Sequence, residues 1–203
     1  MATRTGGAGA APEANEALRA QIVRAADALY YSRGITAVGM DEVRSTAGVS
    51  LKRLYALFPG KESLILAVLR HRHGIWEQGV EAAVAAAGSP RGRVLAVFDF
   101  LAEWFTEESF RGCGFVNAFG EMGPGFPSIA QYVREHKEGF QARMAELVRE
   151  AGLPEQLAPQ LALLAEGAQT TAAILGTAEP AEHARAAAET LLDASDATAG
   201  ARP

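Results

Sequence analysis

The sequence predicts an all-α protein of about nine helices, in which three short N-terminal helices precede a larger helical body. Three observations support this fold class. Apolar residues recur at spacings of three and four along most of the 203 residues. Glycine and proline interrupt these stretches where helices would end. The apolar content of 49% suffices for a substantial core, and no run reaches the roughly 18 uncharged apolar residues of a membrane span.

The first part of the chain divides into an arm and a helix. Residues 1–13 are small and polar, and we expect a disordered arm because they have little to bury. Residues 14–33 predict a helix that ends at Gly34, with apolar positions Leu18, Ile22, Ala25, Ala26 and Leu29. The arm lacks the apolar segment of a secretory signal, and a single cysteine suits a reducing compartment, so we expect a cytoplasmic protein.

Two short helices joined by a tight turn are predicted between residues 40 and 58. The apolar stripe of the first helix consists of Met40, Val43 and Ala47. Gly48 ends this helix, because glycine takes a positive φ without a Cβ clash. Ser50 stands where the N-cap of the second helix belongs, and its hydroxyl can accept a hydrogen bond from the backbone N–H of Lys52 or Arg53.

The second of these helices has one apolar face and one face that is polar and basic. Leu54 and Phe58 are separated by one helical turn and predict the buried pair, and Pro59 stops the helix. The residues left to point outward are Leu51, Lys52, Arg53, Tyr55 and Ala56. In helix-turn-helix proteins the first residues of the second helix contact base edges. The stretch therefore predicts a helix that reads DNA.

This region resembles the DNA-binding domain of the TetR family of bacterial transcriptional regulators, without an insertion over roughly residues 16–70. The matching elements are Gly34-Ile35-Thr36, Asp41-Glu42-Val43, Ala47-Gly48-Val49-Ser50, Leu54-Tyr55, Phe58-Pro59 and Lys61-Glu62 with Leu64. Three residues differ from the usual pattern: Gly39, Arg53 and Leu57. Further along, Arg111-Gly112-Cys113, Phe115 and Asn117 are similar to a stretch in one TetR subgroup.

The resemblance implies a helix-turn-helix domain at residues 14–60, a connecting helix at 61–86, a ligand-binding and dimerisation domain at 87–195 and a tail at 196–203. Within the body, helices are expected at residues 93–105, 113–121, 128–151, 154–175 and 181–194. Charge follows the same division. Residues 1–72 carry ten Lys and Arg against six Asp and Glu, whereas residues 73–203 carry nine against eighteen. A basic head on an acidic body suits a DNA-binding protein.

The expected partner is a double-stranded DNA operator. The predicted contact residues are Ser50, Leu51, Lys52, Arg53, Tyr55, Ala56 and Lys61. Lys52 or Arg53 can donate to guanine, Leu51 and Ala56 can meet a thymine methyl group, and Tyr55 and Lys61 can bind phosphate. One reading helix contacts few base pairs, so a dimer on a palindromic site is expected. In the resembled family a small molecule usually releases the DNA, which implies a repressor.

The effector is expected to be small and apolar or aromatic, because the middle helices carry aromatic and soft side chains with a few polar ones among them. The candidate pocket residues are Phe98, Leu101, Trp104, Phe105, Phe115, Asn117, Phe119, Glu121, Met122, Tyr132, His136, Phe140, Met144, Gln169 and Thr170. Taken singly, each of these side chains is better explained by core packing, whereas the polar residues among the apolar ones together favour a cavity.

The last two long helices are rich in alanine and have few bulky polar side chains, so they would expose apolar surface in a monomer. We expect them to pair across a two-fold axis as a four-helix bundle. The predicted homodimer residues are Leu157, Leu161, Leu164, Ala168, Ala172, Leu175, Ala184, Ala188 and Leu191.

Several alternatives stay open on the sequence alone. Cys113 is the only thiol, so a redox-responsive regulator is possible, as is a DNA-binding regulator without a ligand. Cys113, His136 and Glu121 could form a nucleophile set, but no signature groups them and an enzyme is not expected. A pure protein-interaction module is a further alternative. His71 and His73 point to different helix faces, so neither a metal site nor a cofactor is expected.

Overall fold

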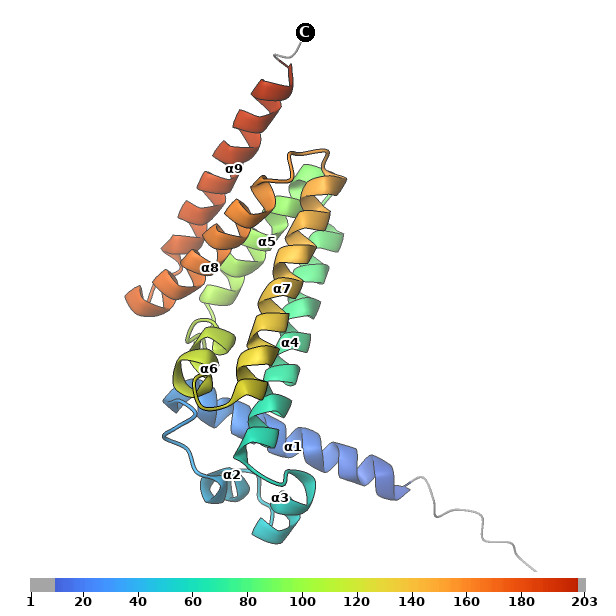
Figure 1. Ribbon diagram of the computed structural model, residues 1–203, viewed down its shortest axis with the longest axis vertical. Coiled ribbons are helices and arrows are strands. Elements are labelled where there is room, and N and C mark those ends of the chain that lie inside the picture. The colour runs from blue at the N-terminus through green and yellow to red at the C-terminus, as the bar shows by residue number, and fades with distance from the viewer. Residues whose placement is uncertain (1–9, 201–203) are drawn as a thin grey trace, which may run out of the picture.

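The structure is a computed structural model that describes residues 10–200, with side chains described from residue 13 to residue 195. Within that range the chain forms nine α-helices and no strand, which confirms the all-α fold class (Figure 1). The helices are α1 Ala10–Arg33, α2 Met40–Thr46, α3 Leu51–Leu57, α4 Lys61–Ala86, α5 Pro90–Phe105, α6 Gly114–Met122, α7 Pro127–Glu150, α8 Leu157–Leu175 and α9 Glu179–Gly200.

The helices form a head and a body that share α4. Helices α1, α2 and α3 lie together at one end, and α4 runs from this head into a body made with α5, α7, α8 and α9 (Figure 1). The short helix α6 lies between the head and the body. Because α4 belongs to both parts and α6 contacts α7 and α4, the head is not joined to the body by a loose linker.

Local sequence explains the geometry of the head. Gly48 has φ +66°, and the Ser50 hydroxyl accepts from the Arg53 backbone N–H at 3.2 Å, so both the predicted turn and the predicted cap are confirmed. The head core includes Ile22, Ala26, Val38, Val43, Leu54, Phe58, Leu64 and Ile65. The same core continues into Phe115, Ala118, Met122, Ile129 and Val133 of α6 and α7. The base of the body is therefore packed directly on the head.

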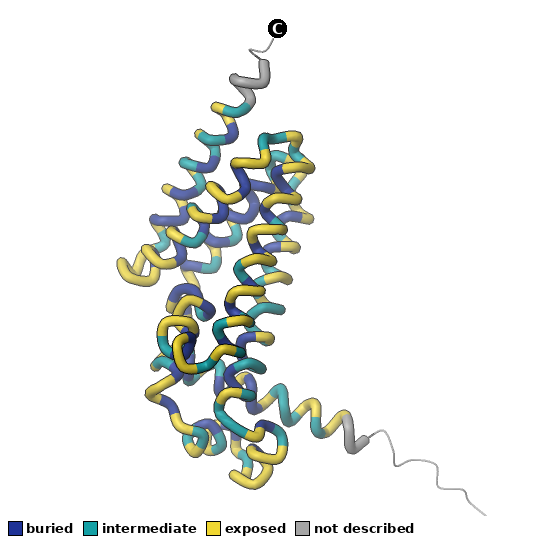
Figure 2. Tube along the Cα trace, viewed as in Figure 1, coloured by how far each residue is buried: buried dark blue, intermediate teal, exposed yellow. Residues whose placement is uncertain are grey.

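The body has its own core, formed where α4, α5, α7, α8 and α9 face one another (Figure 2). Its largest fully buried side chains are Phe98, Leu101, Met144, Leu147, Leu161 and Leu192. The small residues of α8 and α9 allow these helices to approach closely, and each also packs against α5. Within residues 10–200, none of the helices combines the length and the apolarity that crossing a bilayer requires.

Several predicted boundaries differ from the observed ones. Helix α1 begins at Ala10, so the end of the predicted arm is helical, and residues 1–9 lie outside the described residues. Helix α5 begins at Pro90 because the Ser89 hydroxyl caps it by accepting from the Gly92 N–H at 3.0 Å. Helix α9 continues to Gly200, so residues 196–200 of the predicted tail are helical, and residues 201–203 lie outside the described range.

The predicted dimer face was wrong for six of its nine residues. Leu157, Leu161, Ala168, Ala172, Ala184 and Ala188 are buried inside the protomer, where α8 packs on α5, α7 and α9. The apolar face left exposed on α8 is offset by a few residues. It includes Leu163, Ile174 and Leu175, which are 71%, 77% and 64% exposed, with Leu164 and Leu191 partly buried nearby. Both faces of α8 are apolar, so residue periodicity did not separate them.

Candidate DNA-reading helix and effector cavity

Helix α3 presents the predicted surface to solvent. Leu54 is fully buried and Phe58, which caps the helix, is nearly so, whereas Leu51 and Tyr55 are exposed. Ser50, Lys52, Arg53 and Ala56 are exposed as well. The structure therefore brings six of the seven predicted DNA-contact residues together on one outward face, and their contact with DNA stays a prediction.

Two polar side chains of α1 hold the helix-turn-helix in place, and the sequence analysis missed both. The Arg19 guanidinium donates to the Leu57 carbonyl at 2.7 Å and lies 4.4 Å from the centre of the Phe58 ring. The Gln21 amide donates to the Ala47 carbonyl at 2.8 Å. Both carbonyls lie at the C-terminal end of a helix, where no intrahelical N–H is available to them. Side chains of α1 therefore supply the missing donors for the last turns of α2 and α3.

Two of the predicted DNA contacts have partners within the head. The Arg53 guanidinium donates to the Asn15 side-chain oxygen on α1. The seventh predicted residue, Lys61, lies in the first turn of α4, and its ammonium is 5.9 Å from the centre of the Tyr30 ring. Burial lowers the pKa of Lys61, and the nearby Glu121 carboxylate opposes this shift.

Glu121 was predicted as a ligand contact, but the structure places it at the junction of head and body. Its carboxylate accepts from the backbone N–H groups of Ile35 at 3.0 Å and Thr36 at 2.8 Å, and from the Thr36 hydroxyl at 2.8 Å. Burial acts to raise the Glu121 pKa, but these donors and Lys61 outweigh it, so the pKa lies below its usual value. Glu121 thus ties α6 to the loop between α1 and α2.

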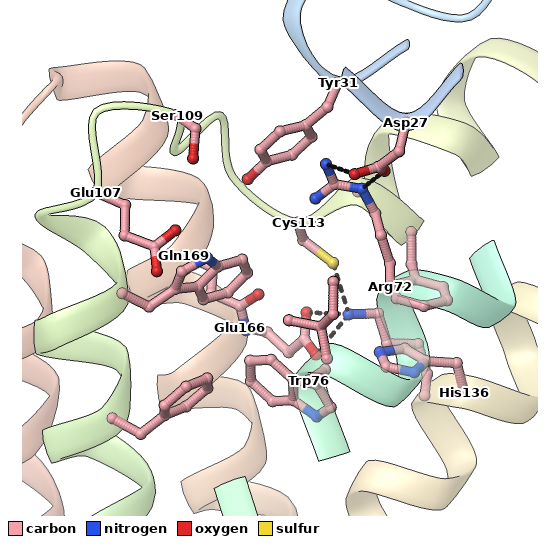
Figure 3. Close-up of a pocket in the computed structure, with 16 residues that line it drawn as sticks. Asp27, Tyr31, Arg72, Trp76, Glu107, Ser109, Cys113, His136, Glu166 and Gln169 are labelled. Carbon is pink, nitrogen blue, oxygen red and sulfur yellow. Dashed lines mark hydrogen bonds and ion pairs between the residues drawn. The ribbon is translucent and has the colours of Figure 1, made fainter. Parts of the chain in front are cut away.

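A cavity of about 210 Å³ lies in the body next to the head (Figure 3). Its wall comes from six helices and the segment before α6. The lining residues are Asp27, Tyr31, Arg72, Ile75, Trp76, Phe100, Trp104, Glu107, Ser109, Cys113, Gly114, Phe115, His136, Lys137, Glu166 and Gln169. Of the predicted pocket residues, only Trp104, Phe115, His136 and Gln169 are among them. Since Asp27 and Tyr31 belong to α1, the head itself forms part of the wall.

Arg72 connects this wall to α1. Its guanidinium forms a two-point ion pair with the Asp27 carboxylate, the longer contact being 3.1 Å from Nη2 to Oδ2. The same guanidinium lies 3.4 Å from the centre of the Tyr31 ring. Gly114 permits this position, because a Cβ there would lie 3.0 Å from the Arg72 Cδ. The sequence pattern around Arg72, between His71 and His73, gave no indication of this role.

Tyr31 makes a second connection between α1 and the body. Its hydroxyl donates to the Gly112 carbonyl at 2.7 Å and accepts from the Arg111 N–H at 2.9 Å. Burial raises the Tyr31 pKa, while the Arg111 N–H and the nearby Arg72 act in the opposite direction. The α1 side of the cavity is therefore held by one ion pair and two hydrogen bonds that span head and body.

The opposite side of the cavity contains a second ion pair. The Lys137 ammonium on α7 lies 2.6 Å from both carboxylate oxygens of Glu166 on α8. It also lies 3.2 Å from the sulfur of Cys113, which is buried. The pairing of Lys137 and Glu166 had no signal in the sequence, because 29 residues separate them and neither interrupts a recognisable motif.

His136 lies at the floor of the cavity and also borders a more open hollow of about 640 Å³ between α4 and α7. Its ring stacks on Phe115 with centroids 3.5 Å apart, and its Nδ1 is 3.0 Å from the His73 Nδ1. Burial, followed by the charges of Lys137 and His73, lowers the pKa of His136 to about 3. Phe140, another predicted pocket residue, lines the hollow and not the cavity.

The remaining predicted pocket residues lie elsewhere. Phe98, Leu101, Phe105, Met122 and Met144 are core residues whose side chains fill the space between helices. Asn117 donates to the Arg111 carbonyl at 3.2 Å, and Tyr132 packs beside Phe115 and His73 without lining the cavity. Phe119 and Thr170 are exposed, on the outward sides of α6 and α8. The helical spacing of the predicted pocket residues indicated buried faces of the middle helices. Which of these faces line the cavity was decided by the packing of the helices against one another.

The three residues considered as a nucleophile set are not brought into mutual contact. Cys113 contacts Lys137, His136 contacts His73, and Glu121 accepts from the loop after α1. These contacts do not join Cys113, His136 and Glu121 into one nucleophile set.

Comparison with protein families matches both parts of the chain. Residues 22–68 match the profile described as bacterial regulatory proteins, tetR family, and residues 90–188 match the tetracyclin repressor-like C-terminal domain. The HTH-type transcriptional activator FasR of Mycolicibacterium smegmatis is 30% identical over 146 residues, which are 71% of this chain and 65% of that protein. The HTH-type transcriptional regulator BetI of Rhizobium meliloti is 37% identical over 93 residues, 45% of this chain and 46% of BetI. The matches thus span less than two thirds of these relatives.

Solved structures extend the likeness over nearly the whole fold. SCO4454, a TetR-family transcriptional regulator from Streptomyces coelicolor, has a TM-score of 0.82 and 28% identity, covering 89% of this chain and 96% of that one. The reduced form of E. coli NemR has a TM-score of 0.78 at 23% identity, covering 87% and 97%, and supports the fold alone. With both domains matched and the helix-turn-helix formed by α2 and α3, the chain belongs to the TetR family of helix-turn-helix transcriptional regulators.

Proposed function

We propose that the protein is a homodimeric repressor that leaves a palindromic operator when a small apolar or aromatic molecule enters the cavity between α1 and the body. One observation supports this most directly: α1 serves both the reading helix and the cavity. Arg19 and Gln21 of α1 bind the ends of α3 and α2, and Asp27 and Tyr31 of the same helix line the cavity. A displacement of α1 at the cavity is therefore transmitted to α3.

The release mechanism follows from the contacts of Arg72 and Tyr31. A ligand in the cavity competes for the space beside the Asp27–Arg72 ion pair and the Tyr31 hydrogen bonds. If it fits best when these contacts are shifted, it stabilises a different head position. A ligand moves such an equilibrium only by its difference in affinity for the two positions. We infer that the ligand favours a head position in which the two α3 helices of the dimer are no longer about 34 Å apart. This is the spacing that successive major grooves require, so the dimer leaves the DNA.

DNA recognition is assigned to the outward face of α3. Arg53 exchanges its Asn15 contact for the two acceptors of guanine, and Lys52 and Tyr55 contact the neighbouring base or phosphate. A protein that acts on bacterial DNA works in the cytoplasm. Dimerisation is assigned to the exposed apolar face of α8, which includes Leu163, Ile174 and Leu175, together with the adjoining part of α9 around Leu191. An exposed apolar face of this kind marks an interaction surface.

The proposal is tested by selecting duplexes from a random pool with the purified protein and measuring affinity by fluorescence anisotropy. We expect a palindromic consensus, and we expect Arg53→Ala to relax the preference at one base pair of each half-site. A library of aromatic compounds is then screened for release of this duplex, with Trp76→Ala as a variant whose cavity is altered. Transcription in vitro from a promoter carrying the consensus distinguishes repression from activation. Release that is identical in the wild type and in Trp76→Ala would contradict the cavity as the effector site.

A second candidate, a redox-responsive regulator acting through Cys113, is favoured by one observation. The Lys137 ammonium lies 3.2 Å from the Cys113 sulfur, and a nearby cation stabilises a thiolate, which is the reactive form. Here oxidation of Cys113, and not occupation of the cavity, would release the DNA. Cys113→Ser separates the two candidates, since it removes an oxidant response and leaves release by an aromatic ligand intact.

A further inference from the structure

The charges on the cavity wall are unequal. Three carboxylates line it, from Asp27, Glu107 and Glu166, against the two cations of Arg72 and Lys137. Each cation is already paired, Arg72 with Asp27 and Lys137 with Glu166. Among the residues that the structure describes, no ion-pair partner is found for Glu107. An incoming anion would have to displace Asp27 from Arg72 or Glu166 from Lys137, whereas an incoming cation can interact with the Glu107 carboxylate.

Two polar side chains of the wall, Gln169 and His136, also favour a ligand that carries a hydrogen-bond donor and a positive charge. Gln169 is only 2% exposed, and its amide nitrogen donates to the Ala165 carbonyl of its own helix at 3.4 Å. Its side-chain oxygen has no hydrogen-bond donor within the part of the chain that the structure describes. Because Gln169 lines the cavity, this oxygen can accept a hydrogen bond from a ligand that supplies an N–H or O–H group. His136, whose pKa is well below neutrality, adds no positive charge to the floor.

The apolar part of the wall is aromatic. Trp76 packs edge to face against Phe100 and Trp104, with ring centroids 5.5 and 5.6 Å apart. Phe100 and Trp104 are nearly parallel at 6.1 Å. Aromatic π-systems attract organic cations, and Trp does so most strongly. Phe100 and Trp104 lie on α5 and Glu107 follows the end of this helix, while Trp76 faces them from α4, so one ligand can contact the rings and the carboxylate.

We propose that the effector is an aromatic or apolar amine that is protonated when bound. Its ring lies among Trp76, Phe100 and Trp104, and its ammonium group donates to the Gln169 side-chain oxygen and is attracted by Glu107. This inference rests on the proposed function only in taking the cavity as the effector site, and it adds the chemical class of the ligand.

Three probes with one skeleton test the proposal: para-tert-butylbenzylamine, para-tert-butylbenzyl alcohol and para-tert-butylbenzoate. They present a cation, a neutral donor and an anion, respectively. The chain has two tryptophans, and both line the cavity, so tryptophan emission reports on this site, although Trp76 also borders the open hollow between α4 and α7. Binding to the full-length protein is measured by tryptophan emission and, independently, by calorimetry. We expect the amine to bind most tightly, the alcohol less tightly, and the benzoate most weakly.

Two matched variants isolate the contribution of charge. Glu107→Gln removes the unpaired carboxylate, and Glu108→Gln makes the same change at the next position, which does not line the cavity. Glu107 is exposed to solvent, which screens its charge, so we expect Glu107→Gln to weaken the amine about threefold and leave the alcohol unchanged. Glu108→Gln should leave both affinities unchanged. Gln169→Leu should weaken both the amine and the alcohol, because each donates to the amide oxygen.

The outcomes separate this inference from the function on which it rests. Benzoate binding as tightly as the amine would overturn the assigned ligand class, and so would equal effects of Glu107→Gln and Glu108→Gln. In either case the cavity would still bind a ligand, and the proposed function would stand. If none of the three probes changed the emission or released heat, both the ligand class and the role of the cavity would be contradicted, while DNA binding by α3 would remain separately testable.

Discussion

Asp27 of α1 and Arg72 of α4 form a two-point ion pair in which each side chain is only 17% exposed. The pair joins the head to the body and is also part of the cavity wall. It therefore contributes to the stability of the junction, and it lies where a ligand can change it.

Removal of one partner should be costly at this site. We expect Asp27→Asn to lower the free energy of unfolding by about 2–3 kcal/mol, because Arg72 is left with a poorly solvated charge. The double variant Asp27→Leu/Arg72→Met should recover most of this loss. Urea denaturation of the wild type, Asp27→Leu, Arg72→Met and the double variant in a double-mutant cycle measures the coupling. Glu189→Gln, which breaks the exposed pair with Arg185, serves as a control and should cost at most about 1 kcal/mol.

Specificity for DNA should depend on Arg53 and affinity on Lys61. Arg53→Ala should relax the preference at one base pair of each half-site by about 1–3 kcal/mol. Lys61→Gln should instead weaken binding evenly across sequences and reduce the salt dependence by about one counterion per protomer. Anisotropy titrations on matched and single-mismatch duplexes at several salt concentrations distinguish the two effects. Arg149→Gln, at the far end of α7, provides a control for net charge and should change neither quantity.

Self-association should depend on the exposed apolar face of α8. We expect Leu163→Glu and Ile174→Glu to give monomers in sedimentation velocity, because a charge in an apolar interface must be desolvated without a partner. Helical content should be unchanged, since neither side chain belongs to the protomer core. Ala145→Glu, exposed on α7, introduces the same charge elsewhere and should leave the sedimentation coefficient as in the wild type. A wild-type protein that already sediments as a monomer would contradict this assignment.

His136 should make stability fall in acid. Its folded-state pKa, about 3, lies below the usual value of 6.5, so the folded protein binds the proton more weakly than the unfolded chain. The contribution of His136 is therefore complete above pH 6.5 and is lost progressively as the pH falls toward 3. His136→Phe keeps a ring stacked on Phe115 and should flatten this part of the profile. The free energy of unfolding at several pH values is the measurement, and identical profiles would contradict the burial of a neutral His136.

The reading helix could be predicted from the sequence because its determinants are local. The positive φ of Gly48, the Ser50 cap and the spacing of Leu54 and Phe58 all act within one or two helical turns. Together they determine which side chains of α3 face outward, whatever the rest of the chain does. The separation into a basic head and an acidic body was likewise visible in the distribution of charged residues.

The cavity and the free face of α8 were decided only by tertiary structure. The contacts of Arg72 with Asp27 and of Lys137 with Glu166 join residues 45 and 29 positions apart, and no local pattern encodes such pairings. Leu161 and Leu163 lie two positions apart on a helix that is apolar on several sides, yet one is buried and the other exposed. The sequence determined which helices form, since that depends on neighbouring residues. The packing of those helices determined which of their apolar faces became core, cavity or free surface, because that depends on what lies opposite.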